Sequence, residues 1–135
     1  MCPRIIKGGS FKDQRGEIIF NNSFDALGIK RLYIIQNNPS APERGWQGHK
    51  IEQRWFTCIQ GTFEVVLKKV LDWEANGVFG KEERYELSIE TMDVLHVPPG
   101  YVSKLIAKTA GAKILAMSDY LIEEIEDEFR FSLDI

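Results

Sequence analysis

Cysteine is scarce in this sequence, and a long apolar run is missing. The two cysteines, Cys2 and Cys58, show no spacing of a disulfide framework, which fits a reducing compartment. Cys58 lies inside an apolar, strand-like stretch, where we expect a buried thiol. No apolar run approaches the roughly 18 residues of a membrane-spanning helix, and Met1 to Lys7 lacks the apolar core of a signal peptide. We therefore expect a cytoplasmic protein that does not enter a membrane.

A basic surface is also missing. The 17 lysines and arginines are scattered among 20 aspartates and glutamates, and the net charge is −3. Proteins that bind nucleic acid or anionic membranes carry clustered basic residues, so we expect neither partner. A chain of 135 residues with 44% hydrophobic residues is long enough to bury its own core. We expect a single domain over residues 1–135.

Short runs rich in β-branched and aromatic residues recur about every ten residues, and turn signals end each of them. This spacing predicts an all-β sandwich or barrel. In the run 62–71, Phe63, Val65 and Leu67 recur at every second position and are expected to share one face. The expected strands are 15–20, 29–36, 53–59, 62–71, 84–89, 94–97, 101–107 and 113–120.

The C-terminal stretch has a different period. Leu121, Ile122, Ile125 and Phe129 recur at helical spacing, with acidic residues between them. This pattern predicts a short C-terminal helix that packs on the barrel.

The stretch RGWQGHK, residues 44–50, leads into a strand and resembles the first sequence motif of a cupin barrel. A metal-binding cupin would carry histidine at 47 and 49, a glutamate near 54 and a histidine near 103. This chain has Gln47, His49, Arg54 and Ser103 there. One imidazole is too few for a metal that needs about three or four ligands, and Arg54 adds a permanent cation. We expect no metal and no cofactor, so that any chemistry comes from side chains.

Further segments narrow the resemblance. The segments DQRG at 13–16, KRLY at 30–33, VPPG at 97–100 and MSDY at 117–120 occur in order around the motif. The set resembles the nucleotide-sugar cupins that act on dTDP-4-keto-6-deoxyhexoses, namely the sugar 3,4-ketoisomerases and the dTDP-4-dehydrorhamnose 3,5-epimerases. The resemblance covers roughly residues 10–130. It implies a cupin-type double-stranded β-helix, or jelly-roll barrel, that is a homodimer without metal and acts on a dTDP-linked 4-keto sugar for surface-polysaccharide synthesis.

The departures from these families fall on the reacting groups. The ketoisomerases carry His-x-His in the motif, and this chain keeps the second histidine as His49 with Gln47 in place of the first. They also carry a histidine near Ser103. The epimerases place their base at the position of Gln47 and a tyrosine acid near Leu115, so both of their reacting groups are missing here.

Both reactions begin when a base removes a proton from a carbon beside the C4 ketone, and histidine is the natural base near neutral pH. Residues two apart in a strand share a face, so Gln47 and His49 are expected to line the same side of the barrel. Gln47 can donate and accept hydrogen bonds but cannot titrate. We expect His49 as the base, with Tyr33 and Gln47 polarising the sugar oxygens; a purely structural, hydrogen-bonded His49 is the alternative.

The substrate-binding candidates also have structural alternatives. By resemblance, Arg44 meets the diphosphate through its planar guanidinium, and Arg15 has the same two interpretations as Arg44, diphosphate ligand or surface residue. Trp46 stacks on the base or sugar, or packs in the core. Arg54 faces the nucleotide sugar, or is buried against an acidic partner. The remaining candidates for the pocket wall and rim are His96, Tyr101, Ser103, Asp119 and Tyr120.

Three functions stay open from the sequence. The first is an isomerase that moves the keto group between C4 and C3, which the retained His49 favours. The second is a C3 or C3/C5 sugar epimerase with a different base. The third is a module that binds a nucleotide sugar without turnover, which the missing histidines favour.

Overall fold

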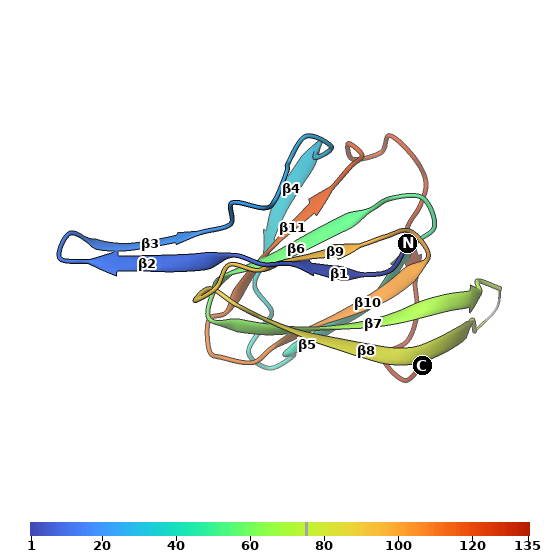
Figure 1. Ribbon diagram of the computed structural model, residues 1–135. Coiled ribbons are helices and arrows are strands. Elements are labelled where there is room, and N and C mark those ends of the chain that lie inside the picture. Colours follow the sequence, from blue (N-terminus) through green and yellow to red (C-terminus); the bar gives the residue numbers. More distant parts are fainter. Residues whose placement is uncertain (75) are drawn as a thin grey trace.

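The computed structural model describes residues 1–74 and 76–135, and these residues form strands and turns with no helix (Figure 1). None of the described residues belongs to a helix long and apolar enough to cross a membrane. The strands are β1 (Arg4–Ile6), β2 (Gly9–Asp13), β3 (Gly16–Phe20), β4 (Arg31–Ile35), β5 (Glu43–His49), β6 (Arg54–Gln60), β7 (Thr62–Asp72), β8 (Val78–Ser88), β9 (Val94–Val97), β10 (Tyr101–Ala107), β11 (Lys113–Ser118) and β12 (Phe129–Arg130).

Two five-stranded antiparallel sheets face each other, with the strand orders β1-β9-β6-β11-β4 and β12-β5-β10-β7-β8 (Figure 1). Alternating side chains fill the space between them. Phe63, Val65 and Leu67 of β7 are fully buried in this core, as their alternation predicted, and Cys58 is buried with them. All eight expected strands are present, so the prediction of an all-β barrel is confirmed. Strand β8 begins at Val78, earlier than expected, and β1, β2 and β12 were not predicted.

The outer face of the second sheet carries its own apolar cluster. Trp46, Val66 and Val102 are buried there, and the aromatic rings of Trp73 and Phe131 pack against them. The end of the chain is tied to this face through two backbone hydrogen bonds between Trp46 and Phe131, of 3.2 and 3.0 Å. The C-terminal residues thus lie beside β5, the strand that contains the RGWQGHK motif.

The predicted C-terminal helix is wrong. Residues 121–128 form turns and extended backbone, and Phe129–Arg130 pair with β5 as strand β12. Glu123 has a φ of 64°, which a right-handed helix does not permit. The Asp127 carboxylate accepts hydrogen bonds from a distant turn. These tertiary contacts outweigh the apolar spacing that suggested a helix.

We expect Gly45→Ala to destabilise the barrel by about 1–3 kcal/mol. Gly45 has a φ of 151°, and a Cβ atom there would lie 2.8 Å from the Ser103 backbone oxygen and 2.9 Å from the Lys104 Cα atom. Backbone atoms of β10 cannot yield as a flexible side chain could. Urea unfolding followed by tryptophan fluorescence measures the change.

The matched control is Gly28→Ala, because an added Cβ at Gly28 has no neighbouring atom within 4 Å. This variant should unfold within about 0.5 kcal/mol of the unchanged protein. Equal stability of the two variants would contradict the close approach of β5 and β10.

Candidate active site

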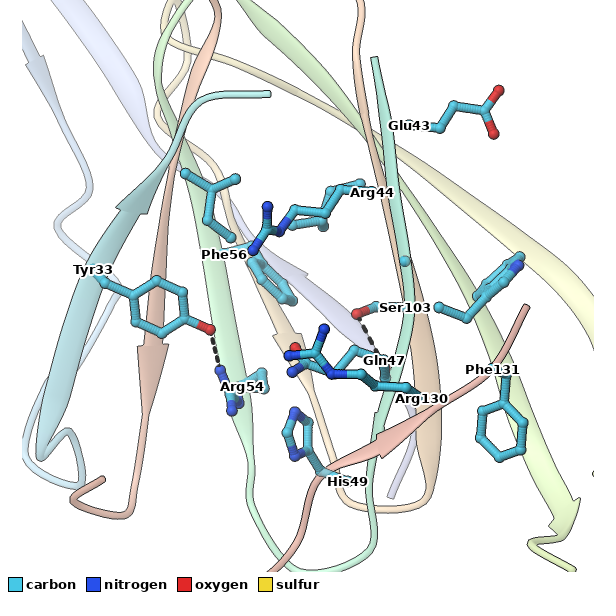
Figure 2. Close-up of a pocket in the computed structure, with 14 residues that line it drawn as sticks. Tyr33, Glu43, Arg44, Gln47, His49, Arg54, Phe56, Ser103, Arg130 and Phe131 are labelled. Atoms are coloured by element: carbon cyan, nitrogen blue, oxygen red, sulfur yellow. Dashed lines mark hydrogen bonds between the residues drawn. The ribbon is translucent and has the colours of Figure 1, made fainter. Parts of the chain in front are cut away.

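A cavity of about 390 Å³ opens between the two sheets, a size common for small-molecule sites. Strands β4, β5, β6 and β10 and the C-terminal residues contribute to its wall. Figure 2 shows Arg44, Arg54 and Arg130 converging on it together with Gln47 and His49. Its lining residues are Tyr33, Ile35, Glu43, Arg44, Gly45, Trp46, Gln47, His49, Arg54, Phe56, Ser103, Leu105, Arg130 and Phe131.

A second cavity, of about 180 Å³, adjoins the first. Glu52 and several C-terminal residues between Leu121 and Glu128 contribute to its wall. The two cavities share the side chains of Tyr33, Gln47, His49 and Arg54.

His49 is held with a defined ring orientation. Its side chain is only 7% exposed, and its Nδ1 lies 2.7 Å from the backbone oxygen of Asp127. A carbonyl oxygen can only accept, so Nδ1 carries the proton and Nε2 is left unprotonated. None of the described residues hydrogen-bonds Nε2. Burial, and next the charge of Arg54, lower the pKa of His49 below its usual 6.5, against the raising effects of Asp127 and Glu52. The imidazole is therefore neutral at pH 7.

The turn after β5 is fixed by Asp127 from the C-terminal segment. One carboxylate oxygen accepts from the backbone N–H of Lys50 at 2.8 Å, and the other accepts from those of Ile51 at 2.8 Å and Glu52 at 2.7 Å. A buried carboxylate that accepts three N–H bonds is fully satisfied. Asp127 thus positions both His49 and Glu52.

Glu52 is a buried carboxylate beside His49. One of its oxygens accepts from the Ser118 hydroxyl at 2.5 Å and lies 3.5 Å from an Arg54 nitrogen and 3.7 Å from an Arg31 nitrogen. The other oxygen lies 3.2 Å from Nδ1 of His49. The charges of Glu52 and Arg54 therefore offset each other in the interior.

Arg54 also donates a hydrogen bond to the hydroxyl of Tyr33 (Figure 2). Because the guanidinium can only donate, the hydroxyl oxygen accepts, and its own proton remains available to another acceptor. Tyr33 lines both cavities. Arg54 is thus buried against an acidic partner, Glu52, and it also lines the cavity.

Gln47 contacts the C-terminal segment. Its side-chain amide donates to Glu128 at 2.8 Å, and Glu128 also accepts from Arg130. The hydrogen bond from Arg130 lowers the pKa of the Glu128 carboxyl. The Ser103 hydroxyl lies 3.5 Å from the Gln47 backbone oxygen, at the limit of a hydrogen bond (Figure 2). The wall of the main cavity includes all three of these side chains, Gln47, Ser103 and Arg130.

His49, Glu52 and Asp127 are close enough to offer one ligand atom each within 4.8 Å of one another. The donors do not fit a metal ion, however. Both oxygens of Asp127 are occupied by backbone N–H groups, and Nδ1 of His49 is bonded to a carbonyl. The Arg54 guanidinium lies against Glu52. The three side chains are already bonded to the backbone or paired with Arg54, so their donor atoms are not free to hold a metal.

Most of the remaining sequence candidates lie outside the main cavity, and Trp46 is the exception. His96 stacks on Trp55 at 5.0 Å, and its Nε2 lies 2.6 Å from the Gln53 side-chain oxygen. Asp119 accepts from Gln53 rather than forming the cavity rim. Trp46 contributes to the wall, but its ring packs in the outer cluster, 5.0 Å from the Lys68 amine.

Three further sequence candidates, Arg15, Tyr120 and Tyr101, also lie outside the main cavity. Arg15 is bonded to Asp13 at the tip of the β2–β3 hairpin, which extends away from the barrel (Figure 1). Tyr120 packs with the Lys30 amine at 5.7 Å from its ring. Tyr101 is buried in the core and reaches only a small inner cavity.

Three residues of the site were missed by sequence reasoning: Glu52, Asp127 and Arg130. Glu52 lies three residues after His49, a spacing that could have drawn attention to it. Asp127 and Arg130 gave no signal, because the C-terminal stretch was expected to form a short helix.

We expect Asp127→Asn to destabilise the protein by about 2–4 kcal/mol. The amide removes a buried charge and turns one acceptor into a donor, so at least one of the three N–H groups of residues 50–52 loses its partner. Urea unfolding measures the loss. The neighbouring Glu126→Gln, at an exposed position, serves as the control with an expected change under about 0.5 kcal/mol. Equal effects of the two variants would rule out Asp127 as the anchor of this turn.

Comparisons with known structures show the same fold. The 3,4-ketoisomerase QdtA from Thermoanaerobacterium thermosaccharolyticum, solved in complex with TDP, is 23% identical over 98% of this chain and 89% of that chain, with a TM-score of 0.71. A mutant of that enzyme was solved with TDP-4-keto-6-deoxyglucose. The dTDP-4-dehydrorhamnose 3,5-epimerase from Elizabethkingia anophelis is 20% identical over 98% of this chain and 76% of that chain, with a TM-score of 0.72.

A third similar structure is the WlaRB TDP-quinovose 3,4-ketoisomerase from Campylobacter jejuni, 20% identical over 93% of this chain and 90% of that chain, with a TM-score of 0.66. No curated protein sequence is significantly similar to the chain. The cupin-type fold expected from the motif is thereby confirmed. Residues 2–131 match the family described as "WxcM-like, C-terminal", FdtA, and the chain belongs to that family.

Proposed function

We propose that this protein is a metal-independent isomerase that moves the keto group between C4 and C3 of a dTDP-4-keto-6-deoxyhexose. The observation that carries the proposal is His49, a buried neutral imidazole whose Nδ1 is bonded and whose Nε2 remains available in a cavity with three arginines. Such a ring is an efficient general base near pH 7. The TDP-sugar ligand of the similar ketoisomerase supports the substrate class. We place the reaction in the cytoplasm, in the synthesis of a sugar for surface polysaccharide.

The proposed reaction needs two proton carriers, and the site offers His49 and Tyr33. His49 removes the proton from C3, and the negative charge moves onto the C4 oxygen. Tyr33 gives its proton to that oxygen and takes one from the C3 hydroxyl, so that a ketone forms at C3. His49 then returns its proton to C4. Arg54 stabilises the charge on Tyr33 during this exchange, since it already donates to the hydroxyl.

The diphosphate is proposed to bind at the mouth of the cavity through Arg44. Its side chain reaches toward Phe56 in Figure 2, while the neighbouring Glu43 points away. Arg44 forms no ion pair with any of the described residues, in contrast to Arg54 and Arg130. A guanidinium without a carboxylate partner is well suited to a diphosphate, which offers paired oxygens to its planar fork.

Two other functions have an observation in their favour. Gln47 occupies the position of a family histidine and is bonded to Glu128, which favours a sugar-nucleotide binder without turnover. An epimerase of the 3,5 type shares the fold. Its tyrosine acid would be expected near Leu115, but Leu115 packs with Trp55 and Met117 in a cluster apart from the cavity. Both are weaker than the isomerase, because a binder leaves the arrangement around His49 without a role and the 3,5-epimerases' tyrosine acid is missing here.

The test is incubation with dTDP-4-keto-6-deoxyglucose in deuterated buffer, read by proton NMR. We expect a product with its ketone at C3, and we expect His49→Asn to lower the rate by about 10²–10⁴-fold. Deuterium at C3 or C5 with the ketone still at C4 would instead establish an epimerase. No conversion, together with a melting temperature raised by dTDP, would establish a binder. Full turnover by His49→Asn would refute the role of His49.

A homodimer is also proposed, because two apolar surfaces are uncovered in the single chain. Phe11 and Ile18 face each other across the β2–β3 hairpin and are 56% and 60% exposed. Leu32 and Ile34 of the edge strand β4 are 63% and 57% exposed. Exposed edge strands and apolar patches are usually covered in a soluble protein. A second copy of the chain is proposed to cover both.

Light scattering after size-exclusion chromatography tests the dimer. The unchanged protein should have twice the mass of the chain, and the double variant Phe11→Glu, Ile18→Lys should have the single mass. The new opposite charges preserve the cross-strand pairing while removing the apolar surface. Lys12→Gln, on the same hairpin, is the control and should remain dimeric. A dimeric double variant would contradict a hairpin-mediated interface.

A further inference from the structure

Glu52 lies directly behind the proposed base, on the side away from the main cavity. It is 8% exposed and contributes to the walls of the two smaller cavities, but not to the wall of the 390 Å³ cavity. Its carboxylate lies 3.2 Å from Nδ1 of His49. A substrate in the main cavity would therefore meet His49, and Glu52 would act on the substrate only through that ring.

The carboxylate of Glu52 is held in place by several groups. The Ser118 hydroxyl donates to one oxygen at 2.5 Å, and the Arg54 and Arg31 guanidinium groups lie 3.5 and 3.7 Å away. The backbone N–H of Glu52 donates to Asp127 at 2.7 Å. Both the side chain and the backbone of Glu52 are thus anchored, so the oxygen beside His49 has a fixed position.

We propose that Glu52 is a positioning residue that acts through His49: beside the Asp127 carbonyl that accepts the Nδ1 proton, it supplies the negative charge that stabilises the imidazolium formed when Nε2 takes a proton. This inference rests on the proposed function. The arrangement follows the logic of a catalytic triad, in which a buried carboxylate orients a histidine without itself taking the proton. No bond to carbon is made or broken by Glu52.

The other charged groups around His49 cannot replace Glu52. Arg54 of β6 places a positive charge near the ring and, after burial, is the next cause that lowers the pKa of His49. Asp127 has its nearest carboxylate oxygen at 3.9 Å, and both of its oxygens already accept backbone N–H groups. Glu128, also from the C-terminal segment, is bonded to Gln47 and Arg130. Loss of the Glu52 charge would leave Arg54 as the dominant charge at the ring.

The first test measures the titration of His49 directly and needs no substrate. The signals are simple to assign because the chain has only two histidines. Two-dimensional ¹⁵N–¹H NMR of the imidazole rings reports the tautomer and titration of each, and His96→Gln assigns them. In the unchanged protein, His49 should be the Nδ1–H tautomer. In Glu52→Gln, its titration midpoint should fall by about one pH unit or more, since a nearby anion that favours imidazolium is lost. Ser118→Ala retains the carboxylate and should leave the midpoint within about 0.3 unit.

An unchanged His49 titration midpoint in folded Glu52→Gln would overturn the proposal. If Glu52→Gln shows no cooperative melting, Glu52→Asp replaces it. That variant keeps the charge but moves it from the ring by about one C–C bond, and the proposal then requires a smaller fall of the midpoint in the same direction. A midpoint equal to that of the unchanged protein would overturn it in this variant too.

The second test uses turnover of the dTDP-4-keto sugar. Glu52→Gln should lower kcat by about 10²–10⁴-fold with little change in KM or in dTDP affinity, and the acidic limb of the kcat profile should move to lower pH. A merely structural role would lower the amount of folded protein without moving the acidic limb of the kcat profile. An unmoved acidic limb would therefore overturn the proposal. If the unchanged protein shows no turnover, the proposed function fails, and the imidazole titration alone decides the role of Glu52.

Discussion

The carboxylate of Asp127 is the contact on which the arrangement of the site depends. It accepts three backbone N–H groups from the turn that connects β5 to β6, and the backbone oxygen of the same residue accepts the Nδ1–H of His49. One residue therefore fixes the path of the turn, the tautomer of the histidine and the position of Glu52. It also explains why the C-terminal segment is not helical, since a helix would direct this carboxylate and its carbonyl elsewhere.

Charge balance in the interior follows from that arrangement. Glu52 and Asp127 bring two negative charges into the barrel, and Arg54 brings a positive charge beside them, with Arg31 at the margin. Buried charges are tolerated when each has partners, and here each carboxylate has several. The neutral His49 lies among these groups. Its pKa is lowered first by burial and next by the charge of Arg54, and it is raised by Asp127 and Glu52. A change in any of these groups would therefore alter the pH at which the ring takes a proton.

The sequence predicted more of the barrel than of the site. The eight expected strands followed from alternation and turn residues, and the shared face of Gln47 and His49 followed from strand periodicity. His96 could not be oriented in this way, because all four residues of β9 are buried and alternation gives no contrast there. The role of Asp127 could not be predicted, because its hydrogen bonds to the turn span 75 to 77 residues of sequence. Such a contact between the C-terminal segment and a turn leaves no periodic pattern in the sequence.

Strand β5 is constrained on both of its faces. Gln47 and His49 are directed to the cavities, whereas a Cβ atom at Gly48 would lie 2.7 Å from Val102 and 2.9 Å from Trp73 on the opposite face. Changes at positions 47 to 49 would therefore disturb either the chemistry or the packing. The exposed residues that line the cavity, Glu43, Arg44 and Arg130, carry no such double constraint. Side chains at these three positions can therefore change, and with them the substrate that fits, at little cost to the packing of the barrel.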